Sequence, residues 1–181
     1  MRKIKRLFII IIWICLTSCV PTRSTSIIYS DSYDKRSDQT SVTIFPYGAV
    51  KIPGQWTKTK ENRVGGQYFF IGKDSVIISI ALSPWDEYEF SSNNREVTPG
   101  NFVRKFYEWD SNYLKAKTNG QVRIVKEDRE RNYLIWNIKN EQGLNDYFLF
   151  GLKGKIATNF YVSTNNWDEE RKINFLELLF N

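Results

Sequence analysis

The N-terminal segment that ends at Cys19 constrains this chain more than any other feature, because it decides which part of the chain folds. Its apolar run of 10 residues, 7–16, follows a stretch that carries four positive charges. A helix that spans a bilayer needs about 20 apolar residues, whereas a secretory signal has a shorter apolar run behind a positive end. We therefore expect residues 1–18 to be a signal peptide that is removed.

The residues around the expected cleavage site are Leu16-Thr17-Ser18-Cys19. They resemble the bacterial lipobox, in which a small residue precedes a cysteine that receives a diacylglycerol thioether before cleavage. The resemblance implies that Cys19 is lipidated, becomes the first residue of the mature protein and attaches it to a membrane. An uncleaved N-terminal helix with an incidental cysteine is the alternative.

Loss of the signal changes the charge and the cysteine content of the chain. The whole chain has 26 basic and 20 acidic residues, and removal of the four basic residues leaves 22 and 20, a net charge of +2. A nearly neutral mature protein gives no support to nucleic-acid binding. Because Cys15 leaves with the signal and Cys19 carries lipid, the folded part has neither a disulfide nor a thiol nucleophile.

The segment after Cys19 is rich in Ser, Thr, Asp and Arg and shows no sustained hydrophobic period. We expect residues 19–40 to form a lipidated flexible tether, which as a coil spans roughly 25 Å. Only Ile27, Ile28 and Tyr29 are suited to dock on the domain. Residues 41–181 are expected to form a single globular domain, which is long enough for one hydrophobic core.

From residue 41 onward, short runs of β-branched and aromatic residues alternate with turn signals, a pattern typical of strands. The predicted strands are residues 41–45, 49–52, 67–71, 75–82, 121–127, 133–139, 147–152 and 156–163. Their connections are short, which favours antiparallel neighbours.

Two segments have the periodicity of helices instead. The first helix is predicted to begin at Thr98, with Pro99 in its first turn. Its apolar side is formed by Phe102, Phe106, Trp109 and Tyr113. The second is predicted from about Asn166, with a buried stripe of Ile173, Leu176, Leu179 and Phe180. The fold class is therefore predicted to be α+β, an antiparallel β-sheet of about six to eight strands with two helices packed on it in an α/β/α-like sandwich.

Local signatures accompany this order of elements: Val50-Lys51-Ile52-Pro53 followed by Trp56, a hairpin ending in Ile77-Ile78-Ser79-Ile80, the helix after Thr98-Pro99, and the final Phe175-Leu176-Glu177-Leu178-Leu179-Phe180. Over residues 41–181 they resemble the PsbP/Mog1-like superfamily, in particular its bacterial lipoprotein members. The resemblance implies a sandwich fold without a conserved catalytic set, among relatives that serve as accessory, assembly, chaperone or partner-binding proteins. The long loop 83–97 departs from the compact members.

The chain contains no histidine, which excludes Ser-His-Asp and Cys-His catalysis and histidine-ligated metals. Two acidic clusters remain, residues 85–89 and 127–131. In the second cluster arginines alternate with carboxylates, which favours a solvated turn. We assign no catalytic residue, no metal ligand and no cofactor.

The first acidic cluster lies in loop 83–97. Because loops on a rigid scaffold often carry function, its residues are the candidate binding surface: Trp85, Asp86, Glu87, Tyr88 and Glu89. Aromatic rings beside carboxylates also suit a sugar or calcium site, although the spacing matches no EF-hand. The alternative is a structural loop that Trp85 and Phe90 pin to the sheet.

The tryptophans after the signal fall into two groups. Trp109 and Trp136 lie in periodic segments and are expected in the core. Trp56, Trp85 and Trp167 lie in loops or at a helix start and are expected to be partly buried. An exposed ring among these three would favour a carbohydrate platform.

Two functions follow from the sequence. The favoured one is a non-enzymatic, membrane-anchored lipoprotein that acts as a binding, assembly or accessory module in the bacterial cell envelope, with a protein or envelope partner. The alternative is a carboxylate-dependent glycan hydrolase or glycan-binding protein that uses loop 83–97. Val20 is not the aspartate that favours the inner membrane in enterobacterial-type sorting, so we expect the outer membrane, facing the periplasm.

Overall fold

The structure, a computed structural model, describes residues 27–62, 65–92 and 94–181. The expected signal peptide, Cys19 and residues 20–26 of the expected tether lie outside the described residues. No helix within the described ranges is long and apolar enough to cross a membrane.

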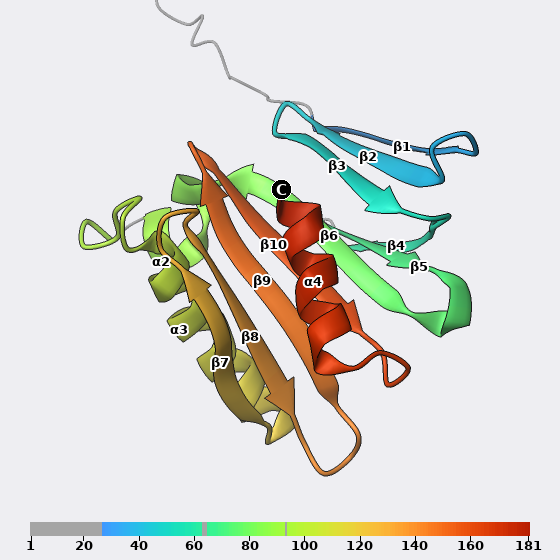
Figure 1. The fold of residues 1–181 in the computed structure, drawn as a ribbon. Helices are drawn as coiled ribbons and strands as arrows, with labels where there is room; N and C mark the ends of the chain where they lie inside the picture. Colours follow the sequence, from blue (N-terminus) through green and yellow to red (C-terminus); the bar gives the residue numbers. More distant parts are fainter. Residues whose placement is uncertain (1–26, 63–64, 93) are drawn as a thin grey trace, which may run out of the picture.

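The chain forms two antiparallel sheets and two main helices, which confirms the predicted α+β class (Figure 1). The larger sheet has seven strands in the order β4-β5-β6-β10-β9-β8-β7. These strands are β4 (Thr57–Asn62), β5 (Gln67–Ile71), β6 (Ile77–Pro84), β7 (Gln121–Asp128), β8 (Tyr133–Lys139), β9 (Asn145–Lys153) and β10 (Ile156–Ser163). Every neighbouring pair is antiparallel, as was predicted for the strands that short connections join.

The smaller sheet corrects the predicted tether. Its strands are β1 (Ile28–Asp34), β2 (Gln39–Phe45) and β3 (Gly48–Pro53). A tether that extends to residue 40 is therefore wrong from Ile28 onward. β1 has no hydrophobic period of its own, because it is an edge strand that is held by pairing with β2 and by the stacking of Tyr29 on Tyr68 at 4.3 Å. Of the three residues expected to dock, Tyr29 packs on the domain, while Ile27 and Ile28 are exposed.

The two helices begin slightly later than predicted. Helix α3 (Phe102–Thr118) starts four residues after Thr98, because residues 98–101 form a turn in which Asn101 N–H donates to the Thr98 carbonyl at 3.1 Å. Helix α4 (Glu169–Phe180) is capped by Asp168, whose carboxylate accepts the Arg171 N–H at 2.7 Å. Asn166 instead donates its side-chain amide to the Asp74 carbonyl at 2.9 Å.

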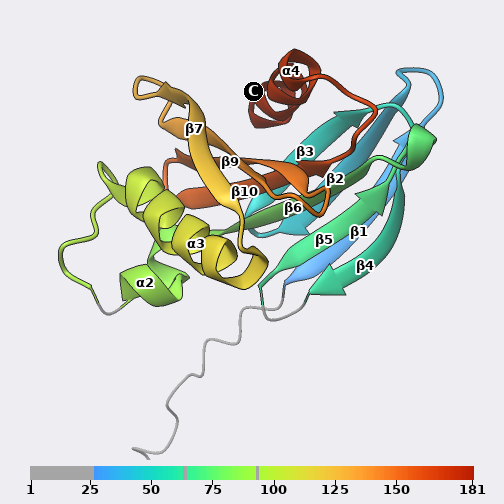
Figure 2. The same ribbon diagram turned by 90° about the horizontal axis from the view of Figure 1, so that it is seen from below.

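The seven-stranded sheet buries both of its faces over its central strands (Figures 1 and 2). One face packs against α4 and the three-stranded sheet, around Leu149, Phe160 and Leu176. The other face packs against α3, around Phe106, Trp136 and Phe150. Helices therefore lie on opposite faces of one sheet, as the predicted sandwich requires. Trp136 is fully buried and stacks on Phe148 at 4.4 Å, which confirms its place in the core.

The Phe180 ring of α4 packs closely over Gly151 of β9, because a Cβ atom there would overlap this ring and the Thr158 hydroxyl. We expect Gly151→Ala to lower the free energy of unfolding by about 1–3 kcal/mol through overpacking. Gly100→Ala is the matched control, since its Cβ would meet only the Thr98 Oγ1 at 3.9 Å, and it should change stability by less than about 0.5 kcal/mol. Denaturant unfolding measures both, and equal effects would refute the close approach.

Candidate functional site

The apolar side predicted for the first helix is present in α3, but only part of it is covered. Phe102 and Phe106 are buried, whereas Trp109 is 41% exposed and Tyr113 is 57% exposed. The prediction that Trp109 belongs to the core is therefore wrong. We call Trp109 and Tyr113 the aromatic ledge of α3.

The cover over Phe102 and Phe106 comes from loop 83–97, which folds into η2 (Trp85–Glu87) and α2 (Glu89–Ser92). Trp85 meets Phe102 with ring centroids 6.0 Å apart, and Tyr88 meets Phe106 at 4.6 Å. Phe90 stacks on Phe106 at 5.5 Å and on Trp109 at 5.4 Å. Helix α2 has only four residues. The loop therefore covers α3 as far as Trp109, and Tyr113 in the next turn stays exposed to solvent.

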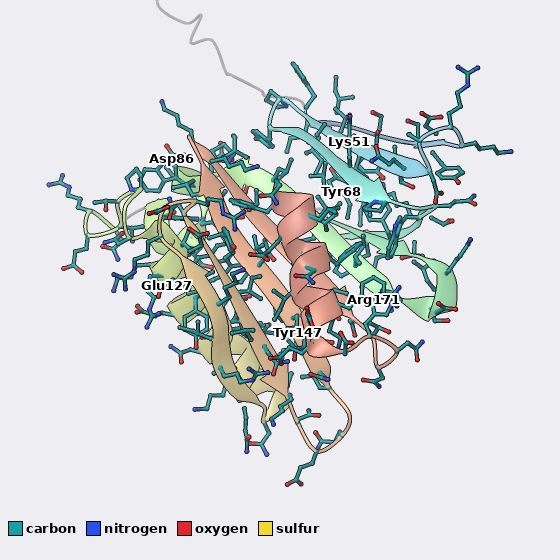
Figure 3. The ribbon with its side chains drawn as sticks, viewed as in Figure 1. Lys51, Tyr68, Asp86, Glu127, Tyr147 and Arg171 are labelled. Carbon is teal, nitrogen blue, oxygen red and sulfur yellow. The ribbon has the colours of Figure 1, made fainter. Side chains whose placement is uncertain are left out.

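The structure divides the five residues of the candidate binding surface into two groups. Trp85 and Tyr88 are half-buried and turn inward onto α3, and burial raises the pKa of the Tyr88 hydroxyl to about 12. Asp86, Glu87 and Glu89 are exposed, and Figure 3 shows Asp86 at the margin of the molecule. Trp85 and Phe90 thus pin the loop, as the structural alternative held, through ring contacts with α3 and through the Trp85 N–H, which donates to the Lys155 carbonyl between β9 and β10 at 3.1 Å.

A shallow hollow of about 210 Å³ adjoins the aromatic ledge. It is lined by Phe90, Asn94, Val97, Lys105, Glu108, Trp109 and Asn112. The lining combines apolar side chains with amide groups and the ion pair Lys105–Glu108, whose Nζ and Oε2 atoms are 3.4 Å apart. A surface of this kind offers ring faces for stacking and a polar edge for hydrogen bonds.

Asp110 lies between the two ledge residues in sequence and on the inner side of α3. Burial raises the pKa of its carboxyl to about 6, and its charge contributes to the raised pKa of Tyr88. The helix thus carries a partly desolvated carboxyl group next to the aromatic ledge in the sequence. No pattern in the sequence signalled this burial, because an Asp on an amphipathic helix ordinarily faces water.

The second acidic cluster is a charged turn at the β7–β8 connection. Arg131 Nε lies 2.8 Å from Asp128 Oδ2, and Arg129 Nε lies 3.4 Å from Glu127 Oε1. Arg104 of α3 adds a third pair with Glu127 at 3.7 Å. The hollow of about 450 Å³ beside this turn is therefore lined by charges that already neutralise one another.

A buried ionic cluster joins α4 to β9. Lys172 and Asp146 are both buried, and burial lowers the pKa of the Lys172 ammonium and raises that of the Asp146 carboxyl. The Lys172 ammonium donates to the Asn145 carbonyl at 3.3 Å, and Tyr161 donates its hydroxyl to Asp146 at 3.0 Å. Tyr147, seen beside the N-terminal end of α4 in Figure 3, donates its hydroxyl to Glu169 at 2.6 Å. These bonds fix the helix on the sheet.

The remaining tryptophans are integrated into the fold. Trp167 is half-buried against Phe175, at 5.1 Å between ring centroids, and Trp85 is half-buried as described. Trp56 is buried more fully than expected and donates its Nε1–H to the Pro53 carbonyl at 2.7 Å. Among the residues that the structure describes, no three carboxylates converge where they could hold a metal ion.

The burial of Asp110 makes stability depend on pH. The raised pKa means that the folded state binds the proton more tightly than the unfolded state, so stability falls as pH rises from about 4 to about 6. We expect Asp110→Asn to raise the free energy of unfolding by about 2 kcal/mol more at pH 8 than at pH 4. Asp86→Asn, at an exposed position, should show no such difference. Denaturant unfolding at both pH values measures this, and an equal gain at both would contradict it.

No family model matches the chain, and no curated protein matches it. The fold is similar to the solution structure of cyanobacterial PsbP from Synechocystis sp. PCC 6803, with a TM-score of 0.40 and 13% sequence identity over 91% of this chain and 94% of that chain.

Proposed function

We propose that this chain is a non-enzymatic, lipid-anchored module of a bacterial cell envelope that binds a protein partner through the aromatic ledge. The observation that carries the proposal is the exposure of Trp109 and Tyr113 on a helix whose neighbouring aromatic residues are all covered. The sequence resemblance to lipoprotein members of the PsbP/Mog1-like superfamily fits this role, because such relatives act as accessory or partner-binding proteins.

Exposed tryptophan and tyrosine rings one helical turn apart favour a partner that covers them, because each ring buries a large apolar area on contact. These two residue types dominate the energetically central part of protein interfaces. Polar side chains accompany the aromatic ring as in such interfaces, because Lys105, Glu108 and Asn112 line the hollow together with Trp109. This arrangement supports a protein partner.

The anchoring part of the proposal rests on the N-terminal sequence. The positive end, the short apolar run and the lipobox-like residues before Cys19 support lipidation. Val20 supports delivery to the outer membrane, with the domain facing the periplasm. The ledge would then meet partners in that space.

The hydrolase alternative finds no support in the geometry. A carboxyl group that acts as a general acid near neutral pH lies in an apolar pocket that raises its pKa. Asp86, Glu87 and Glu89 are instead exposed. Glycosidases also need two carboxyl groups across one cleft, and no hollow described above is lined by two of these three residues.

Cys19→Ser tests the anchor. We expect the wild-type protein to sediment with membranes and to carry a lipid mass on its first residue, and the variant to lose both. Metabolic labelling with a fatty acid and mass spectrometry of the N-terminal peptide measure this. Membrane association of the variant equal to that of wild type would contradict a lipid anchor at Cys19.

Photo-crosslinking tests the ledge. Benzoyl-phenylalanine placed at position 113 is expected to give a discrete crosslinked product in growing cells. The same probe at position 178 should give none, since Leu178 is a comparably exposed helical residue, at 52%, on α4. Adding Trp109→Ala to the position-113 probe should lower the yield at least about tenfold, because a central aromatic contributes about 2 kcal/mol or more to an interface.

Two results would refute partner binding at the ledge. One is a crosslinking pattern at position 113 that equals the pattern at position 178. The other is an unchanged yield when Trp109→Ala is added. Neither result bears on the lipid anchor, which the Cys19→Ser experiment tests by itself.

A further inference from the structure

An exposed apolar corner lies where the described chain begins. It consists of Ile27, Ile28 and Phe45, whose exposed fractions are 51%, 60% and 59%. Ile28 and Phe45 are directly opposite each other in the register of β1 and β2. Side chains at directly opposed positions lie on the same side of a sheet, so these two residues form one patch.

The apolar character of this side of the sheet is confined to that corner. Further along the same side, β1 presents Ser30 and Ser32, opposite Thr43 and Ser41 of β2. The alternate residues of β2, which include Val42 and Ile44, face the interior and are buried. The outer side of β1 and β2 therefore changes from polar to apolar only at the end where Ile28 stands.

The corner is also the part of the domain with the shortest connection to Cys19. Ile27 follows Cys19 by eight residue steps, and each step spans at most about 3.6 Å, so the distance cannot exceed about 29 Å. A lipid on Cys19 would hold the corner near the bilayer surface. Isoleucine and phenylalanine are among the side chains that transfer most favourably into a bilayer.

We propose that Ile27, Ile28 and Phe45 insert into the membrane surface and orient the domain on it, a role that rests on the proposed lipidation of Cys19. In this proposal the contact depends on the insertion of apolar side chains and not on attraction to anionic lipids. Tyr47, two residues beyond Phe45, has a pKa raised by burial and by the nearby charge of Glu87. Neutral phosphatidylcholine is the test surface, because it offers acyl chains without a net charge.

The test tethers the protein without relying on lipidation. Cys19→Ser in the mature chain, with six histidines added before residue 19, attaches it to phosphatidylcholine vesicles that contain a nickel-chelating lipid. The chain has no histidine of its own, so the tag is the only imidazole tether. A single new cysteine at position 28, 45 or 178 then carries a nitrobenzoxadiazole fluorophore, because Cys19→Ser leaves no other thiol in the mature chain.

Nitroxide groups on the lipid chains quench a fluorophore that enters the bilayer. We expect quenching at positions 28 and 45 to exceed quenching at position 178 by about threefold or more, because inserted groups lie at the boundary of the acyl chains. The further changes Ile27→Ser and Phe45→Ser should abolish the quenching at position 28. Leu178 is the matched control because it is an exposed apolar residue on α4.

Two results would overturn the proposal. Quenching at positions 28 and 45 no greater than at position 178 would show that the corner does not enter the membrane. A blue shift of the probe at position 45 that grows with protein concentration in the absence of vesicles would assign the corner to a second copy of the chain. Because the histidine tag supplies the tether, either result leaves the lipidation of Cys19 unaffected.

Discussion

The stacking of Phe106 on Phe150 joins helix α3 to the seven-stranded sheet, and the exposed surface of the helix depends on it. Their ring centroids are 3.9 Å apart and the rings are nearly parallel. This contact sets how α3 is rotated on β9. Once Phe106 faces the sheet, the helical period decides which of the other residues of α3 face the sheet and which face solvent. With Phe106 fixed inward, Trp109 and Tyr113 lie at the open flank of the helix, where Phe90 stacks on Trp109 and the Lys117 ammonium lies over the Tyr113 ring.

Much of the fold follows from local sequence pattern. Each of the eight strands predicted from β-branched and aromatic runs is present, and so are both helices, although the apolar side of α3 is buried only at Phe102 and Phe106. β1 and β4 were missed because edge strands need no hydrophobic face. The sequence of β4, Thr57–Asn62, is entirely polar, and its pairing with β5 is a contact that no single segment encodes.

The candidate site was less predictable, for a different physical reason. Periodicity places Phe102, Phe106, Trp109 and Tyr113 on one side of a helix, but it does not say how far another segment covers that side. The extent of the cover is set by α2, which ends at Ser92. Trp85 and Tyr88 were named as candidate binding-surface residues, and the structure places them, half-buried, in that cover. The burial of Asp110 has the same origin, because it results from segments distant in sequence.

The arrangement of the two proposed surfaces is consistent with a protein that works at a membrane. The apolar corner belongs to the three-stranded sheet, which packs on one face of the seven-stranded sheet together with α4. The aromatic ledge belongs to α3, which packs on the opposite face (Figure 2). Insertion of the corner would therefore leave the ledge accessible, because the thickness of the seven-stranded sheet separates them. A domain held in this way would present Trp109 and Tyr113 to a partner instead of burying them against lipid.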